Sequence, residues 1–96
     1  MNPEMMKKIR KMQAELAQKQ EEFVKKEFTI EKQGLVIVAY GSKKIKSISI
    51  NEALIDPDDK ELLEDILVIA INELNEQIDA EQEEMMPDIP MPGLGM

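Results

Sequence analysis

Residues 60–71 have the sequence KELLEDILVIAI, and their apolar pattern decides how the rest of the chain can fold. The part from Ile66 to Ile71 is apolar throughout, which is typical of a buried strand as well as of a buried helix. Good helix formers continue unbroken from Lys60 to about Glu84, and this length favours a helix. Asp56 can cap the start, and Pro57 suits the first helical position. The stretch therefore predicts a long second helix.

A helix that is apolar on every side must be covered on every side. The chain has only 96 residues, and a domain of this size buries about two thirds of the surface of its unfolded chain. A small sheet covers one side of such a helix, so the remaining apolar side chains need another partner. We therefore expect an obligate homodimer in which a second copy of the chain supplies that cover.

Three short segments of strand type precede this helix. Residues 28–32 alternate in polarity, Leu35 to Tyr40 is a nearly continuous apolar run, and residues 44–50 alternate again. Gln33-Gly34 and Gly41 to Lys43 provide the turns between them. The pattern predicts a three-stranded antiparallel meander.

The N-terminal segment predicts a first helix from Pro3 to about Glu27, with Asn2 as its cap. Its apolar residues form one narrow seam, of the kind that packs against a single partner helix. The seam consists of Met5, Ile9, Met12, Leu16 and Phe23. Residues 87–96 are rich in Pro, Gly and Met and predict a flexible tail. The expected fold class is α+β, in the order helix, three strands, long helix and disordered tail.

Composition excludes most kinds of catalytic site. The chain has no Cys and no His, which removes thiol nucleophiles, thiolate metal sites and the commonest general base. Asp56, Asp58, Asp59 and Glu61 superficially resemble a calcium loop, but Pro57 and the continuing helix leave no room for one. We expect no enzyme, no metal, no cofactor and no small-molecule substrate. No apolar run is long enough for a membrane span, so we expect a cytoplasmic protein.

The charge divides between the two halves of the chain. The first 50 residues hold 11 of the 12 Lys and Arg and have a net charge of +5, whereas the remainder has a net charge of −13. Lys7, Lys8, Arg10 and Lys11 cluster on the first helix, on the side away from the apolar seam, and are candidate contacts for DNA phosphates. The alternative is a solvated helix face. A second basic group, Lys43, Lys44 and Lys46, is better explained as protection of an exposed sheet edge.

Short motifs in a characteristic order extend over nearly the whole chain. They are Met12-Gln13, Gln20 to Glu22, Gly34 to Val36 with Gly41 after it, Asp59 to Ile66 with Ala70 and Asn72 after it, and Met91 to Gly93. In this order and spacing they resemble the YbaB/EbfC family of bacterial nucleoid-associated proteins. The turn around Gly41 is about one residue shorter than the usual pattern of the family, and its basic residues before the third strand match only loosely to the group at Lys43, Lys44 and Lys46.

The resemblance implies an intertwined homodimer whose paired helical arms project from a body like tweezers. It also implies binding of duplex DNA in the nucleoid with little sequence preference, and an influence on gene expression. Residues 1–86 would form a single YbaB/EbfC-like domain. If the start of the first helix lies beside the end of the second, its cations approach Glu81, Glu83 and Glu84, and this neutralisation would weaken DNA binding. The alternative function is a prefoldin-like or other protein-interaction module without nucleic-acid binding.

Overall fold

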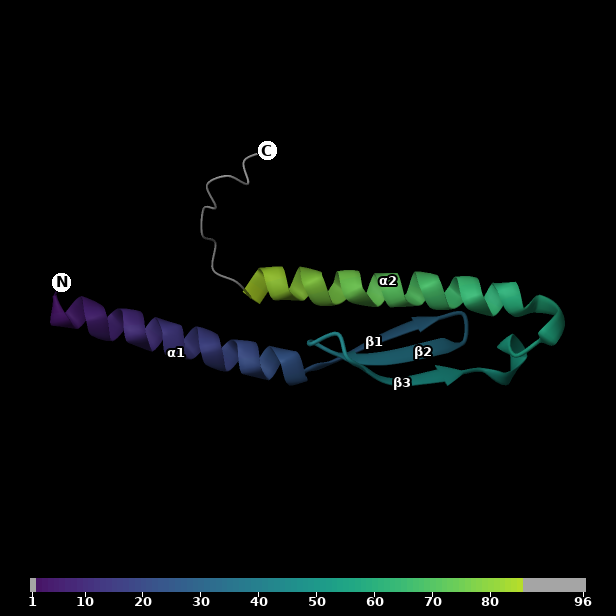
Figure 1. Cartoon of the computed structure of the whole chain (residues 1–96), viewed down its shortest axis with the longest axis horizontal. Helices are drawn as coiled ribbons and strands as arrows, with labels where there is room; N and C mark the ends of the chain where they lie inside the picture. The colour runs from purple at the N-terminus through teal and green to yellow at the C-terminus, as the bar shows by residue number, and fades with distance from the viewer. Residues whose placement is uncertain (1, 86–96) are drawn as a thin grey trace, which may run out of the picture.

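The computed structural model describes residues 2–85, and within them it confirms the predicted order of elements (Figure 1). The elements are α1 (Pro3–Lys25), β1 (Glu27–Lys32), β2 (Leu35–Tyr40), β3 (Ile45–Ile50) and α2 (Lys60–Met85). Short 3-10 turns, Glu52–Leu54 and Pro57–Asp59, connect β3 to α2. The predicted tail at residues 87–96 lies outside the described residues. α1 ends about two residues before the predicted position, because Lys26 has extended backbone angles and leads directly into β1.

The strands form an antiparallel sheet in the order β1-β2-β3, with β2 in the centre. On one face of β2, Leu35, Ile37 and Ala39 are almost completely buried. The sequence spacing of Ile45 and Ile48 is three, which would place them on opposite faces of a regular strand. A register shift in β3 places Ile45 opposite Ala39 and Ile48 opposite Ile37, so that both isoleucines share the apolar face.

α2 lies along this apolar face and packs mainly on β1 and β2. Its buried residues, Ile66, Ala70, Leu74 and Ile78, recur every four positions and form one stripe. β3 receives little of this cover, since Ile45 and Ile48 remain 40% and 46% exposed. The single chain thus leaves one edge of its core open.

The turn between β2 and β3 is fixed to the end of α1 by close backbone packing. The Gly41 amide donates a hydrogen bond to the Lys26 carbonyl oxygen at 2.9 Å, and the Ser42 amide donates one to Val24 at 3.3 Å. A Cβ atom at Gly41 would lie 2.0 Å from the Phe23 carbonyl oxygen, so only glycine permits this approach. Phe23, the one buried residue of α1, packs edge-on against Phe28 with ring centroids 5.6 Å apart.

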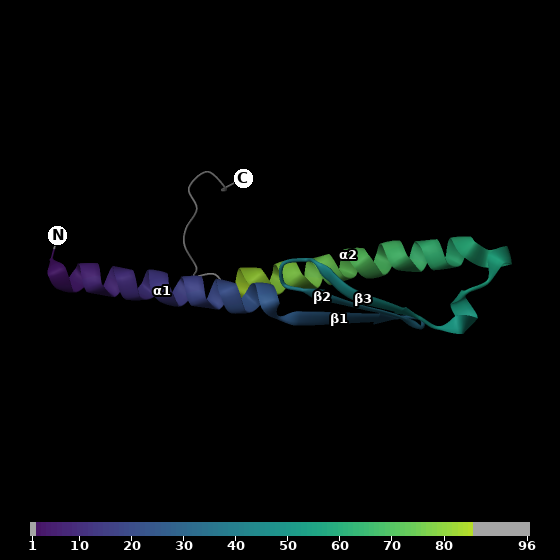
Figure 2. The same cartoon turned by 60° about the horizontal axis from the view of Figure 1, so that its bottom comes forward.

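The rest of α1 projects away from the sheet, as the two views of the molecule show (Figures 1 and 2). The molecule measures 70 × 32 × 14 Å, and its radius of gyration is 19.5 Å. A compact domain of this length would have a radius of gyration of about 12 Å. We call residues 3–22 of α1 the arm, and the sheet with α2 the body.

Candidate nucleic-acid interface

The arm holds the four predicted cations in a regular, fully helical setting. Asn2 caps the helix by accepting a hydrogen bond from the Glu4 amide at 2.9 Å, and Pro3 begins the first turn. The 23 residues of α1 span about 35 Å at about 1.5 Å per residue. Lys7, Lys8, Arg10 and Lys11 are all exposed and lie in the half of α1 farther from the body. The structure therefore presents them as one group at the end of the molecule.

The apolar seam of the arm is exposed as well. Met5 and Met12 are 59% and 60% exposed, and Ile9 and Leu16 are each 41% exposed. At about 100° per residue, Lys7 and Lys11 lie nearly opposite this seam. A partner that covered the seam would leave these two cations free to contact another ligand.

The cations of the arm have no ionic partner among residues 2–85, whereas four lysines outside the arm do. Four ion pairs occur in this part of the chain: Lys26–Glu81 at 2.8 Å, Lys32–Glu73 at 2.7 Å, Lys43–Asp79 at 2.7 Å and Lys46–Glu27 at 2.9 Å. Three of them join α2 carboxylates to lysines of the sheet, its turns or the end of α1. Four lysines outside the arm are thus neutralised, while Lys25, Lys44 and Lys60 share the unpaired state of the arm cations.

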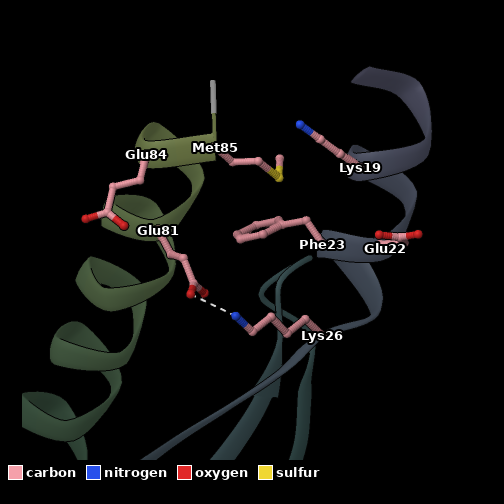
Figure 3. Close-up of a pocket in the computed structure, with 7 residues that line it drawn as sticks. All are labelled: Lys19, Glu22, Phe23, Lys26, Glu81, Glu84 and Met85. Carbon is pink, nitrogen blue, oxygen red and sulfur yellow. Dashed lines mark hydrogen bonds and ion pairs between the residues drawn. The ribbon is translucent and has the colours of Figure 1, made fainter. Parts of the chain in front are cut away.

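Among residues 2–85, the start of α1 does not lie beside the acidic end of α2 (Figure 1). α2 ends at Met85, near the base of α1, where Glu81 points toward Lys26 and the Glu84 carboxylate points away from α1 (Figure 3). Sequence alone could not place this end, because it depends on how far α2 runs along the sheet. Within the described residues, Lys7, Lys8, Arg10 and Lys11 therefore lack the neutralisation that would follow if the start of α1 lay beside the end of α2.

The second basic group lies at and beside the edge strand β3. Lys43 and Lys46 are paired with carboxylates, whereas Lys44 is exposed with no ionic partner among residues 2–85. The hydrogen bond from Lys46 to Glu27 is the main cause that raises the pKa of Lys46. β3 is an edge strand, and Lys46 is the member of this group that lies within it, while Lys43 and Lys44 lie in the turn before it.

An open groove of about 460 Å³ lies between the base of α1 and the end of α2 (Figure 3). Phe23 and Met85 are its apolar residues, and charged side chains surround them. Glu81 accepts a hydrogen bond from Lys26 through Oε1, while its Oε2 atom is shielded and has no partner in the described chain. The groove could not be predicted from the sequence, because 55 residues separate Lys26 from Glu81 and no local pattern links them.

Residues 2–85 contain no cluster of three His, Cys, Asp or Glu side chains that could hold a metal ion. In the same part of the chain, neither long helix has an apolar stretch sufficient to cross a bilayer.

Comparison with known proteins identifies the family. The model of the YbaB/EbfC DNA-binding family matches residues 1–93. A nucleoid-associated protein of Mycoplasmopsis pulmonis is 52% identical over 87 residues, covering 91% of this chain and 87% of that protein. Nucleoid-associated protein MARTH_orf159 of Metamycoplasma arthritidis is 48% identical over 82 residues, which cover 85% of this chain and 86% of that protein. Nucleoid-associated protein LBA0378 of Lactobacillus acidophilus is 38% identical over 78 residues, which cover 79% of this chain and 70% of that protein. The chain belongs to the YbaB/EbfC DNA-binding family.

Proposed function

We propose that the chain is a nucleoid-associated protein that binds double-stranded DNA with little sequence preference. The contacts are Lys7, Lys8, Arg10 and Lys11 on the arms of a homodimer. The observation that carries the proposal is the grouping of these four exposed cations on the projecting arm, where none has an ionic partner among residues 2–85, whereas Lys26, Lys32, Lys43 and Lys46 are paired. Family membership supports DNA as the ligand. The proposal includes no catalytic activity.

Low sequence preference follows from the chemistry of the four side chains. Lysine and arginine that neutralise phosphates release counterions and add affinity without reading bases. The protein would then occupy many DNA sites in the nucleoid, and this occupancy would influence gene expression. Its place in the cell would be the cytoplasm, at the nucleoid.

The homodimer is supported by apolar surface that the single chain leaves open. Val68 and Ile69 on α2 are 59% and 48% exposed, Val68 opposite the buried stripe and Ile69 on its flank. Ile45 and Ile48 on β3 add further exposed apolar area next to the core. A second copy would cover these surfaces and could pair the exposed seams of two arms.

The test compares two double substitutions that remove the same charge. Lys7→Ala with Lys11→Ala removes unpaired cations from the arm, and Lys32→Ala with Lys46→Ala removes paired cations from the body. Binding to two duplexes of equal length and unrelated sequence is measured over a range of salt concentrations. The arm variant should bind both duplexes more weakly. The slope of log affinity against log salt concentration should also become shallower by about 0.9 for each phosphate that is no longer neutralised. The body variant should change binding much less.

Equal effects of the two variants would show that total charge, and not the arm, controls binding. A strong preference of the unmodified protein for one duplex would contradict the low sequence preference. Absence of binding at low salt would favour the alternative, a protein-interaction module that uses the exposed apolar seam.

A further inference from the structure

The junction between arm and body brings together lysines from two distant parts of the sequence. The turn after β2 is held against the end of α1 by the hydrogen bonds of Gly41 and Ser42. This contact places Lys43 and Lys44 near the same end of the sheet as Lys26. The junction thus continues the positive charge of the arm toward the body.

Two carboxylates of α2 occupy lysines of this junction. Glu81 contacts Lys26 at 2.8 Å and Asp79 contacts Lys43 at 2.7 Å. Both acids lie close in sequence to Ile78, which is completely buried against the sheet. The buried position of Ile78 therefore fixes where these carboxylates meet the junction.

Both ion pairs are of the kind that exchanges readily for another anion. The side chains of Lys26 and Glu81 are 53% and 38% exposed, and those of Lys43 and Asp79 are 45% and 53% exposed. Exposed pairs of this kind contribute little to stability. In addition, the shielded Oε2 atom of Glu81 lacks a hydrogen-bond partner among residues 2–85, which makes the paired state of Glu81 less favourable.

The backbone of Lys43 indicates that its side chain matters. Its φ angle is 73°, in the left-handed region that favours glycine or asparagine. The Lys43 amide closes the turn by donating to the Tyr40 carbonyl oxygen at 2.8 Å, a bond that glycine would make equally well. The turn itself therefore has no need of a lysine at this position.

From these observations we infer that Lys26 and Lys43 are two further phosphate contacts, one on each flank of α2, masked in the free protein by Glu81 and Asp79. The inference rests on the proposed function, because the arm must first hold the duplex. A phosphate of the bound DNA then replaces each carboxylate at the lysine Nζ atom, and the released carboxylate turns to solvent. The paired carboxylates disfavour the binding of small anions to Lys26 and Lys43, because small anions make no additional contacts with the arm.

The first test removes the mask without changing side-chain size. Asp79→Asn with Glu81→Gln unmasks the junction, and Glu61→Gln with Glu64→Gln removes the same charge at the exposed start of α2. The unmasked variant should bind duplex DNA about twofold to thirtyfold more tightly per subunit, the equivalent of two exposed ion pairs that need not be broken. The control variant should gain much less. Equal gains would overturn the inference, because the effect would then come from total charge.

The second test asks whether the gain passes through the two lysines. Adding Lys26→Ala and Lys43→Ala to the unmasked variant should abolish its gain, and a gain that persists would overturn the inference. Lys43→Gly alone should keep or raise the melting temperature, since glycine fits the φ angle, and should still weaken DNA binding. Unchanged binding of Lys43→Gly would also overturn it.

The outcomes separate this inference from the proposed function. If the arm substitutions weaken binding but Asp79→Asn with Glu81→Gln has no effect, only the masking fails. If no variant binds duplex DNA, the unmasked one included, both fail.

Discussion

At the residue scale, Gly41 connects the arm to the body, and its replacement should be costly. In Gly41→Ala the new Cβ would meet the Phe23 carbonyl oxygen at 2.0 Å, and a backbone atom cannot rotate away. Overpacking of this kind costs about 1–3 kcal/mol. The melting temperature should therefore fall by roughly 4–20 °C for a domain of this size.

Calorimetry or circular dichroism at a fixed protein concentration checks this expectation, since dimer stability depends on concentration. Ser49→Ala, at an exposed position of β3, is the matched control and should melt like the unmodified protein. If Gly41→Ala also melts at that temperature, the close packing of the turn on α1 is absent in solution.

Residue identity predicted some of the local geometry and missed the rest. Gly34 was expected in a turn, and its φ angle of 93° confirms that expectation. Lys43 was also expected in a turn, but nothing in the sequence indicated a left-handed backbone at a lysine. The ion pairs of Lys26 and Lys43 were missed for a related reason: they depend on the position of α2 over the sheet.

At the element scale, polarity patterns, turn residues and helix propensity predicted the strands and the end of α2 to within one residue, whereas Asp56 and Pro57 begin a 3-10 turn and α2 itself starts at Lys60. The bounds of β2 match the predicted run from Leu35 to Tyr40, because turn residues delimit it on both sides. α1 was predicted too long, since Lys26 and Glu27 are polar and fit the end of a helix as well as the start of a strand. The register shift in β3 could only be inferred once the face of each isoleucine was known.

The outward face of α2 gives the clearest test of the proposed dimer. Ile69 is 48% exposed in the single chain, so Ile69→Asp removes little of the core within one subunit. In a dimer that covers this face, the new carboxylate would be buried without a partner, which is strongly unfavourable. We expect the variant to separate into subunits or to unfold, as measured by analytical ultracentrifugation and circular dichroism.

Gln77→Asp introduces the same carboxylate at an exposed polar position of α2 and should remain dimeric. A stable dimer of Ile69→Asp with an unchanged melting temperature would place the interface elsewhere. An unmodified protein that sediments as a folded monomer at micromolar concentration would contradict the dimer itself.

At the scale of the whole molecule, a cluster of cations and a cluster of carboxylates lie at opposite ends of the long axis. The projecting arm carries unpaired cations, and the opposite end of the molecule carries Asp56, Asp58, Asp59 and Glu61 at the start of α2. The net charge of −8 hides this division. The sequence showed the charge split and the family resemblance implied the projecting arm, but only the structure places the acidic start of α2 at the end of the molecule opposite the arm.

This polarity predicts how the protein meets DNA: the arm approaches the duplex, and the start of α2 points away from it. The molecule is 70 Å long, many times the screening length of about 8 Å at physiological salt, so the acidic end cannot repel DNA held at the arm. The chain lacks cysteine, so a single dye can be placed through Gln13→Cys on the arm or Glu61→Cys at the start of α2. With a donor-labelled duplex, energy transfer should be high for the dye at residue 13 and low for the dye at residue 61. Both labelled proteins should bind with the affinity of the unmodified chain, and higher transfer to residue 61 would show that the body, not the arm, faces the duplex.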